Sequence, residues 1–423
     1  MTQATISAVS RRVHKWLGDM PPGWRGARLF EAAAAWTSNV DKHTVEGQPT
    51  VRLCNYVDVY KNDAIDGTLD FMTATATPEQ IKRFRIRVGD TLITKDSETA
   101  DDIGVPAFVK YEADDLICGY HLAIVRPNHL QTHPKFLYWA LASEPVARQW
   151  GVLAAGVTRV GIRSTDLSKV TIPLPPLDEQ RAIADYLDQE TAQIDALVAK
   201  QELLLSLLAE RKRSVLDHVL AEVDGAPCRM RWLYRPSNEA NGPDEEVLSV
   251  YRELGVIPKS SRSDNFNKTP ENVDRYLVVR PGDLVVNKMK AWSGSLGVSA
   301  HRGIVSADYE VLRPSTTDLD PVFAHYLLRS PRMVVQYRVR SRGIRPSQWR
   351  LYWPDLADIE VAIPPMDEQV RAARQIKTET EAIDALIAKA EEHIALAKER
   401  RSALITAAVT GQIDVGTASR KAS

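Results

Sequence analysis

Cysteine is scarce in this sequence. Cys54, Cys118 and Cys228 are an odd number at wide spacings, without any C-x-x-C pair. This excludes a disulfide framework and a cysteine-based zinc site, and it predicts a reducing, cytoplasmic location. Long apolar runs are also missing, since no stretch of about 18 apolar residues occurs and Met1–Ser10 lacks the apolar core of a signal peptide. We therefore expect a protein that is neither exported nor membrane-spanning.

The usual catalytic motifs are absent as well. The sequence has no G-x-x-x-x-G-K-[ST] phosphate loop, no H-E-x-x-H, no G-x-S-x-G and no G-x-G-x-x-G. It lacks the Asn or Asp-Pro-Pro-aromatic turn of amino-methyltransferases, and its 9 histidines show no metal-ligand spacing. The acid-x-lysine spacing of metal-dependent nucleases occurs at Glu210 and Lys212, inside the charge pattern of a helix. We expect no catalytic residue, cofactor or metal in this chain.

Length and composition indicate several ordinary globular domains. The 423 residues exceed what one hydrophobic core usually supports, and 44% hydrophobic with 26% charged residues is typical of globular proteins. The formal net charge of −1 lacks the basic excess of a dedicated nucleic-acid binder. The charge is uneven, because residues 173–225 hold 5 Lys and Arg against 11 Asp and Glu, whereas residues 226–362 hold 20 against 16.

The sequence contains a long internal repeat. Pro175–Gln180 recurs as Pro364–Gln369, and at the same offset Ile194–Leu197 recurs as Ile383–Leu386. From Pro175 to Leu216, 18 of 42 positions are identical without gaps. Chance would give two or three identities, so the pattern indicates a duplication, and repeats of this kind define architecture.

Weaker matches lie upstream of each copy, at an offset that drifts as loops change in length. They are Gly89-Asp90 with Gly282-Asp283, Arg126-Pro127 with Arg313-Pro314, and Gly161–Arg163 with Gly343–Arg345. Each half is thus a variable block followed by a helical block. We predict domain boundaries at 1–172, 173–225, 226–362 and 363–423.

The helical blocks carry apolar residues at seven-residue spacing. No Gly or Pro interrupts Asp178–Leu220, so a single helix there would be about 65 Å long at 1.5 Å per residue. Such a helix needs a partner for its apolar stripe, and the second copy is the obvious one. The stripes, most simply interpreted as packing positions, comprise Leu187, Ile194, Leu197, Leu204, Leu208 and Val215, and Ile376, Ile383, Leu386 and Leu404.

The variable blocks have a mixed α/β pattern. Alternating stretches followed by a Gly-Asp turn predict a β-hairpin in each block, and amphipathic stretches predict one helix in each. The fold class that we predict is two α/β domains separated by a long antiparallel two-helix coiled coil. The hairpins are predicted at residues 84–94 and 276–287, and the helices at residues 134–149 and 321–337.

Basic residues gather in equivalent stretches of the two halves. Pro321–Pro354 contains seven arginines, interleaved aromatic residues and no acid. Arginine reads guanine and clamps phosphates, so an uncompensated run favours DNA, although a solvated face is the plainer alternative. The lysines after the Gly-Asp turns are suited to binding phosphates. The alternative is that these segments are ordinary turns with Trp292 in the core. The candidate DNA-binding residues are Lys95, Arg148, Arg159, Arg163, Lys288, Lys290, Trp292, Arg338, Arg340, Arg342, Arg345 and Arg350.

Together and in this order, these motifs resemble the specificity subunit of a type I restriction–modification enzyme. The resemblance rests on the two Pro-Pro-x-x-Glu-Gln entrances, the Gly-Asp turns, the Lys288–Trp292 segment, the Gly-Ile-Arg triplets and the Ala408–Ile413 terminus. The first long helix departs from the pattern, because it ends in Val219–Glu222 where the second has Val409-Thr410-Gly411. The resemblance covers nearly the whole chain.

The resemblance implies a non-catalytic DNA reader. Each α/β block would read one half of an asymmetric bipartite site, and the helices would set the spacer and dock two modification subunits. S-adenosylmethionine, ATP and Mg²⁺ would be used by the modification and restriction subunits. The residues expected to bind these partners are Glu179, Gln180, Ile194, Leu197, Glu368, Gln369, Ile383 and Leu386.

Two other functions stay open at the level of sequence. A coiled-coil scaffold or adaptor would explain the helices but not the arginine runs, and it predicts no DNA-dependent behaviour. A standalone nuclease or methyltransferase would need an unrecognised site, and it predicts activity from the purified chain alone.

Overall fold

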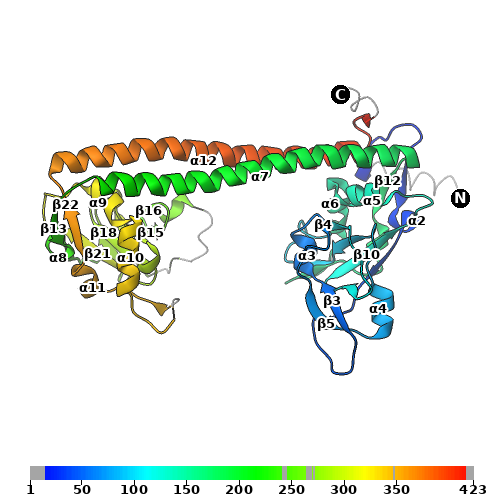
Figure 1. The fold of residues 1–423 in the computed structure, drawn as a ribbon, viewed down its shortest axis with the longest axis horizontal. Helices are drawn as coiled ribbons and strands as arrows, with labels where there is room; N and C mark the ends of the chain where they lie inside the picture. The colour runs from blue at the N-terminus through cyan, green and yellow to red at the C-terminus, as the bar shows by residue number, and fades with distance from the viewer. Residues whose placement is uncertain (1–14, 241–244, 263–268, 270–271, 346–347, 416–423) are drawn as a thin grey trace. The chain divides into compact units, whose positions relative to one another are not determined.

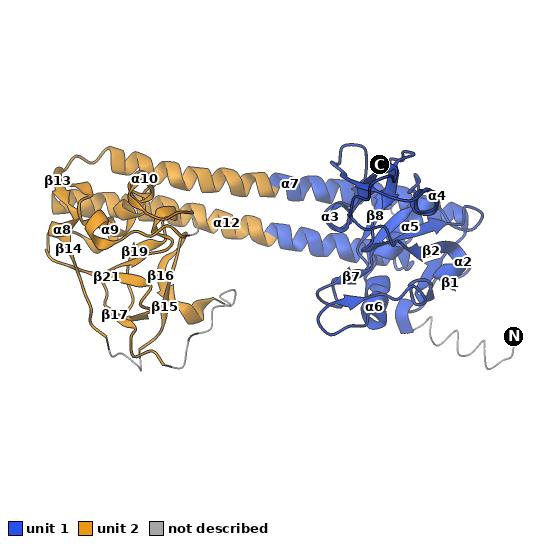
Figure 2. Ribbon diagram, turned by 90° about the horizontal axis from the view of Figure 1, so that it is seen from below, with its two compact units in different colours: residues 1–200, 393–423 blue, residues 201–392 orange. Residues whose placement is uncertain are grey.

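The computed structural model describes residues 15–240, 245–262, 269, 272–345 and 348–415, so that Met1–Ser10 lie outside the described residues. The chain divides into two compact units, residues 1–200 with 393–423 (unit 1) and residues 201–392 (unit 2), as Figure 2 shows. Each unit combines a mixed α/β body with part of each of two long helices (Figure 1). The predicted mixed α/β class with long helices is confirmed. In the part of the chain that the structure describes, no helix is long and apolar enough to cross a membrane.

Unit 1 is built around a five-stranded sheet with a three-stranded sheet beside it. In the five-stranded sheet the order is β2 (Ala33–Thr37), β10 (Leu122–Pro127), β6 (Thr91–Thr94), β8 (Pro106–Val109) and β4 (Ala64–Ile65). The smaller sheet has the order β5 (Met72–Thr75), β3 (Thr50–Cys54) and β9 (Leu116–Cys118). The short helices are α2 (Leu29–Ala32), α3 (Tyr56–Tyr60), α4 (Pro78–Phe84), α5 (Pro134–Ala142) and α6 (Glu144–Leu153).

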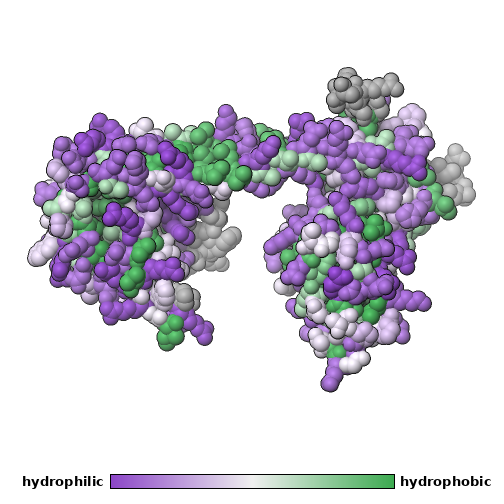
Figure 3. Space-filling view, viewed as in Figure 1, coloured by the Kyte–Doolittle hydropathy of each residue, from purple (hydrophilic) through white to green (hydrophobic). Residues whose placement is uncertain are grey.

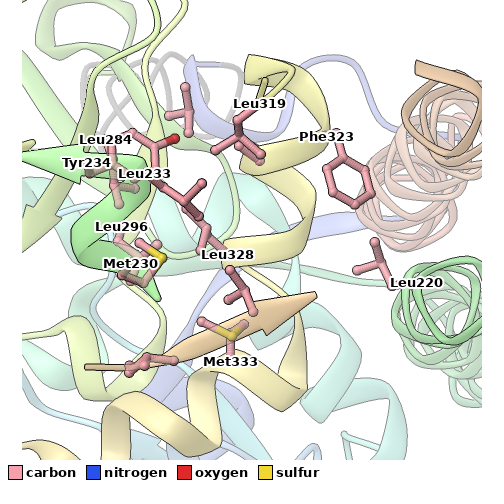
Figure 4. Close-up of a cluster of buried hydrophobic side chains, with 14 of the residues drawn as sticks. Leu220, Met230, Leu233, Tyr234, Leu284, Leu296, Leu319, Phe323, Leu328 and Met333 are labelled. Atoms are coloured by element: carbon pink, nitrogen blue, oxygen red, sulfur yellow. The ribbon is translucent and has the colours of Figure 1, made fainter. Parts of the chain in front are cut away.

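Unit 2 has a four-stranded sheet and, besides the closing strands described below, two smaller strand pairs. The four strands are β14 (Tyr234–Pro236), β21 (Tyr309–Pro314), β18 (Leu284–Asn287) and β19 (Leu296–Val298) in that order. The pairs are β15 (Leu248–Tyr251) with β16 (Gly255–Pro258), and β17 (Leu277–Val279) with β20 (Gly303–Val305). The helices are α8 (Met230–Leu233), α9 (Pro321–Leu328), α10 (Pro331–Arg340) and α11 (Trp353–Ala357). Figure 4 shows how Leu284, Leu296, Phe323 and Leu328 gather in the core between these elements.

In each unit the first and last strands of the body pair with each other. In unit 1, β1 (Arg25–Arg28) lies antiparallel to β12 (Thr171–Leu174). In unit 2, β13 (Ala226–Arg229) lies antiparallel to β22 (Glu360–Ile363). The closing strand then leads into a long helix, which is α7 (Leu177–Ala221) after β12 and α12 (Met366–Val409) after β22.

The two long helices pack against each other and against the body within each unit. In unit 1, Ile183 and Leu187 near the start of α7 share a buried cluster with Ile405 and Val409 near the end of α12. In unit 2, the equivalent cluster joins residues of late α7 to early α12, and Lys212 donates to Asp384 at 2.5 Å. The predicted stripe is only partly a packing stripe, because its members Leu197 and Leu386 are 48% and 53% exposed.

The two predicted β-hairpins are wrong. Residues 78–84 form helix α4, because Thr77 caps its N-terminus by accepting from the Gln80 backbone N–H and Pro78 suits the first turn. In unit 2 both predicted strands exist, but β17 pairs with β20 whereas β18 pairs with β19 and β21. The Gly-Asp turn of unit 2 therefore connects strands of two different sheets, whereas the turn of unit 1 is preceded by helix α4 and a single bridge from Arg85 to Ile117.

The prediction of one helix per block after these strands is also wrong. Each predicted helix is two helices, α5 and α6 in unit 1 and α9 and α10 in unit 2. The breaks fall at Ser143 and Ser330, which adopt extended backbone before a helix that has Pro145 or Pro331 in its first turn. Proline suits a first turn but cannot continue a preceding helix, which explains both breaks.

Candidate nucleic-acid interface

The Gly-Asp turns are structural ion-pair sites that orient the strands below the candidate surface. Asp90 is 2% exposed and accepts from Arg126 Nε at 2.7 Å and Nη2 at 2.6 Å. Asp283 is likewise 2% exposed and accepts from Arg313 at 3.4 and 3.3 Å. In each unit, the aspartate of the repeated Gly-Asp dipeptide thus forms an ion pair with the arginine of the repeated Arg-Pro dipeptide. The Asp283 carboxylate and then Glu239 raise the pKa of Arg313, which therefore remains a structural cation.

The glutamines of the two helix entrances have structural roles too. Gln180 is fully buried, accepts from the His133 N–H at 2.8 Å, and donates to the carbonyls of Pro175 and Gln131. Gln369 makes the same set of bonds in unit 2, where it accepts from the Asp320 N–H and donates to Pro364 and Asp318. A side chain without exposed surface cannot contact a partner, so the direct partner role predicted for both glutamines is wrong.

The other residues predicted to bind partners lie along the long helices. Ile194 and Ile383 are 7% and 8% exposed and pack inward, whereas Leu197 and Leu386 present about half of their surface. Glu179 accepts from the Trp24 indole N–H at 2.7 Å. In the second copy, Glu368 lies 4.0 Å from Arg371 on the same helix.

In unit 2 the structure brings together two basic stretches that are far apart in the sequence. The Leu351 backbone N–H donates to the Lys288 carbonyl at 2.9 Å. The Trp292 ring meets the Trp349 ring edge to face, with 5.7 Å between their centroids. The Lys288–Trp292 segment therefore lies beside the arginine-rich stretch that follows α10. Trp349 was not among the predicted site residues, although it is one of the aromatic residues interleaved with the arginines in the sequence.

The cations on this surface of unit 2 differ in how they are neutralised. Arg342 is 76% exposed but pairs with Asp355 at 2.5 Å, an acid one residue beyond the acid-free stretch. Lys288 donates to the Ala307 carbonyl, Arg340 to Gln336, and Arg329 to the Arg252 carbonyl, so Arg329 is tied to its own unit. Among the described residues, no ion-pair partner is present for the rest of the predicted set, which is Lys290, Arg338, Arg345 and Arg350.

Unit 1 repeats this juxtaposition. The Ile162 backbone N–H donates to the Lys95 carbonyl at 2.8 Å. Strand β7 (Asp96–Ser97) also pairs with β11 (Val160–Gly161). The segment after the first Gly-Asp turn thus lies beside the stretch after α6, as its counterpart does in unit 2.

The cations of unit 1 are more strongly neutralised. Lys95 is 14% exposed, lies 3.4 Å from Asp96, and has its ammonium 4.3 Å from the centre of the Tyr120 ring. Arg148 pairs with Glu144 at 2.5 Å on the same helix face. Arg159 and Arg163 are exposed, and neither has an ion-pair partner within the described ranges.

The predicted equivalence of the two Gly-Ile-Arg triplets is wrong. Ile162 is 5% exposed and takes the place of the buried Leu351, since each donates its N–H to the lysine carbonyl. Ile344 is 95% exposed and belongs to a hairpin. Its structural counterpart is Val157, because each is the fourth residue after the end of a helix, α6 or α10. The two triplets are identical in sequence but not equivalent in structure, because the chain between the preceding helix and the triplet differs in length.

In the described part of the chain, no group of three or more His, Cys, Asp or Glu residues is arranged to hold a metal ion. The candidate surfaces instead offer guanidinium groups, ammonium groups and aromatic rings. These groups suit phosphates and base edges, as in DNA recognition.

Comparison with known proteins shows similarity to DNA specificity proteins. Residues 53–205 match the type I restriction modification DNA specificity domain. The type I restriction enzyme MjaX specificity subunit of Methanocaldococcus jannaschii is 22% identical, over 95% of this chain and 96% of that protein. The EcoDI specificity subunit of Escherichia coli is 20% identical, over 85% of this chain and 82% of that protein.

A solved structure shares the fold. A chain from a study of complex assembly and conformational transition of the type I R-M system superposes with a TM-score of 0.63 at 19% identity. The alignment covers 93% of this chain and all of that chain. The structural match shows a shared fold, and the sequence matches show similarity to DNA specificity proteins of restriction–modification systems. Within that class, the chain is similar to type I restriction enzyme specificity subunits over most of its length.

Proposed function

We propose that this chain is the sequence-specific DNA-binding subunit of a type I restriction–modification complex, and that each α/β body reads one half of an asymmetric bipartite site. One observation carries the proposal. In both units, the segment after the Gly-Asp turn lies beside the segment after the second helix, through the hydrogen bonds Ile162 to Lys95 and Leu351 to Lys288. Each unit also includes exposed arginines that have no acidic partner among the described residues, Arg159 and Arg163 in one unit and Arg338 and Arg345 in the other.

The exposed arginines are the strongest candidates for DNA contacts. A guanidinium without a carboxylate partner can form bidentate bonds to guanine or to phosphate at little electrostatic cost. Arg342 is a weaker candidate, because binding DNA would require it to exchange Asp355 for a phosphate or a base. A scaffold without DNA specificity would have no use for exposed cations that lack an acidic partner among the described residues of both units.

The bipartite part of the proposal rests on internal duplication. The buried pair Asp90–Arg126 has its counterpart in Asp283–Arg313. Both bodies are also closed by their first and last strands, and both helix entrances carry a buried glutamine with equivalent bonds. These correspondences support two bodies of common design whose DNA-facing loops have diverged.

The long helices are proposed to set the spacer of the site and to dock the modification subunits. Helix α7 has 45 residues and α12 has 44, which supports a rigid element of defined length. Several leucines on α7 are 41–60% exposed, and Figure 3 shows apolar side chains gathered on the long helices. An apolar helix face of this kind suits a partner helix. The residues are Leu197, Leu203, Leu204 and Leu207.

We propose that the catalytic groups belong to the partner subunits. The modification subunits would use S-adenosylmethionine, and the restriction subunits would use ATP and Mg²⁺. The proposed place of action is the cytoplasm, where the bacterial or archaeal chromosome and invading DNA are found. This chain would contribute no catalytic group.

Single-molecule methylation mapping tests the proposed function. DNA from cells that carry this chain with its modification subunit is compared with DNA from cells that lack only this chain. We expect a bipartite adenine motif that disappears with the chain. An unchanged methylation pattern, in cells with confirmed expression and an active methyltransferase, would overturn the DNA-reading role and favour the scaffold.

A further inference from the structure

Two apolar side chains are almost completely exposed to solvent. Among the large hydrophobic residues that the structure describes, Val157 and Ile344 have the highest exposed fractions, 104% and 95%. Neither can stabilise the fold by burial, because neither is covered by its own chain. Such a side chain contributes favourable free energy only when another molecule covers it.

Both side chains lie near the start of a tight hairpin on the candidate surface. In unit 1, Ala155 and Gly161 exchange two backbone hydrogen bonds of 3.0 Å. In unit 2, Arg342 and Arg350 exchange bonds of 3.0 and 2.9 Å, and this hairpin projects below α10 in Figure 1. Val157 and Ile344 are each the second residue beyond the first of these pairs, so the two exposed positions are structurally equivalent.

A glycine before each exposed residue allows the hairpin to close. A Cβ atom at Gly156 would lie 2.0 Å from the Arg159 carbonyl oxygen, in a backbone with φ of +148°. A Cβ atom at Gly343 would lie 2.6 Å from the Gln348 carbonyl oxygen. Only glycine fits at both positions. The two hairpins thus share a close backbone approach directly beside an outward-facing apolar residue.

The surroundings of these residues indicate a polyanion with apolar surfaces. Arg159 follows Val157 by two residues and Arg345 follows Ile344 directly, and both arginines are exposed without an ion-pair partner among the described residues. DNA combines phosphates with apolar base surfaces, which are thymine methyl groups in the major groove and base faces at an opened step.

We propose that Val157 and Ile344 make apolar contacts with DNA bases, one in each half-site, an inference that rests on the proposed function. The adjacent arginine binds a phosphate or a base edge and holds the hairpin against the groove. Val157 and Ile344 would thus contact bases although neither side chain carries a charge. The apolar surface that is contacted is either a thymine methyl group or the face of a partly unstacked base.

The test uses the complex of the full chain with its modification subunits and a duplex carrying the mapped motif. The variants are Ile344→Ser and Val157→Ser, with Ile344→Leu as the conservative variant. Leu130→Ser is the matched control, because Leu130 is also highly exposed, at 85%, but lies in the turn before helix α5. Affinity is measured by fluorescence anisotropy on the motif duplex and on a scrambled duplex, and assembly with the modification subunits is measured by analytical ultracentrifugation.

We expect each serine variant to bind the motif duplex about 5- to 30-fold more weakly, as partial burial of one aliphatic side chain implies. Ile344→Leu and Leu130→Ser should stay within about twofold of the wild type. Mapping should show that each serine variant relaxes preference in one half-site only. Unchanged affinity and preference for both serine variants would overturn the inference, and so would weakened assembly with the modification subunits, since the residues would then be protein contacts.

Two modified duplexes identify the apolar partner. If deoxyuridine in place of one thymine weakens the wild type but not the serine variant, the contact is that thymine methyl group. If 2-aminopurine fluorescence rises on binding of the wild type but not of the serine variant, the residue unstacks a base step. Wild-type protein that fails to prefer the motif duplex over the scrambled one would overturn the proposed function itself, which is a different result from loss of preference in the variants alone.

Discussion

The basic surfaces of the two units differ in how far acids neutralise them. In unit 1, Lys95 is held by Asp96 and Arg148 by Glu144. In unit 2, Arg342 pairs with Asp355, while several cations of the same surface have no acidic partner among the described residues. Bodies with equivalent buried contacts therefore carry different amounts of available charge. We expect unit 2 to supply more of the salt-dependent affinity for DNA, since phosphate contacts release counterions.

The largest effect is expected from a change in the long helices. Inserting seven residues into both α7 and α12 should abolish methylation of the original motif and create one with a different spacer, while both half-sequences stay the same. Seven residues are close to two helical turns, so the helix faces keep their alignment. Methylation mapping measures the outcome, and substitution of seven exposed residues without an insertion is the control. Retention of the original spacer would contradict a role for helix length.

The buried ion pairs offer a direct comparison of stability between the units. Asp90→Ala should destabilise the protein by about 1–3 kcal/mol, because it removes the buried carboxylate that accepts two hydrogen bonds from the partly buried Arg126. Asp283→Ala should cost less, since Arg313 keeps Glu239 at 2.9 Å. Urea unfolding, followed by hydrogen exchange in each unit, measures both. Asp114→Ala is the control, because Asp114 is 96% exposed and its pair with Arg85 contributes little. Equal losses in the two units would refute the comparison.

The arginines of unit 2 allow paired and unpaired guanidinium groups to be compared. Arg345→Ala or Arg340→Ala should weaken DNA binding by about 1–3 kcal/mol if the arginine contacts a base edge. Arg342→Ala should weaken it less, because Asp355 already neutralises that side chain. Affinity for the mapped motif and preference over single-base variants are the measurements. If both Arg345→Ala and Arg340→Ala leave affinity and preference unchanged, this stretch does not belong to the interface.

A smaller effect concerns pH and is confined to unit 2. Burial, with a further contribution from Arg329, lowers the pKa of His325 to about 4. The unfolded chain, with a histidine pKa of about 6.5, then binds more protons than the folded one between these values, so stability present above pH 6.5 is lost as pH falls. Between pH 7 and pH 5.5 the loss should be about 1 kcal/mol. Comparing urea unfolding of wild type and His325→Leu across this range isolates the contribution, and identical pH profiles would refute it.

The two long helices could be predicted from the sequence. The helix entrances at Pro175–Gln180 and Pro364–Gln369 predicted the positions of both long helices to within a few residues. The sequence could not show that the glutamines of these entrances are structural, because it does not reveal that each side chain is buried and bonded to three backbone groups. The signal for helix α4 was present, since Thr77, Pro78 and Gln80 form a capping box with proline in the first turn.

Strand pairing and loop equivalence could not be predicted, for a physical reason. Alternation predicts that a segment is extended but says nothing about which strand accepts its hydrogen bonds, as β17 and β18 illustrate. Likewise Ile162 and Ile344 have the same neighbours in the sequence, yet one is buried and the other exposed, because their distances from the preceding helix differ. Of the candidate site residues, the arginines were found by charge, while Val157 and Ile344 required the structure.

The pairing of β1 with β12, and of β13 with β22, has an evolutionary consequence. Because the strands that begin and end a body are hydrogen-bonded to each other, the chain enters and leaves that body at neighbouring points. A body of this kind can be exchanged as a cassette, provided that the replacement keeps the pair of closing strands, the buried glutamine at the helix entrance and the apolar side chains that pack on the long helices. Recombination between two such genes, with crossovers in the helix-coding segments, would then join half-sites from different parents without disturbing either hydrophobic core.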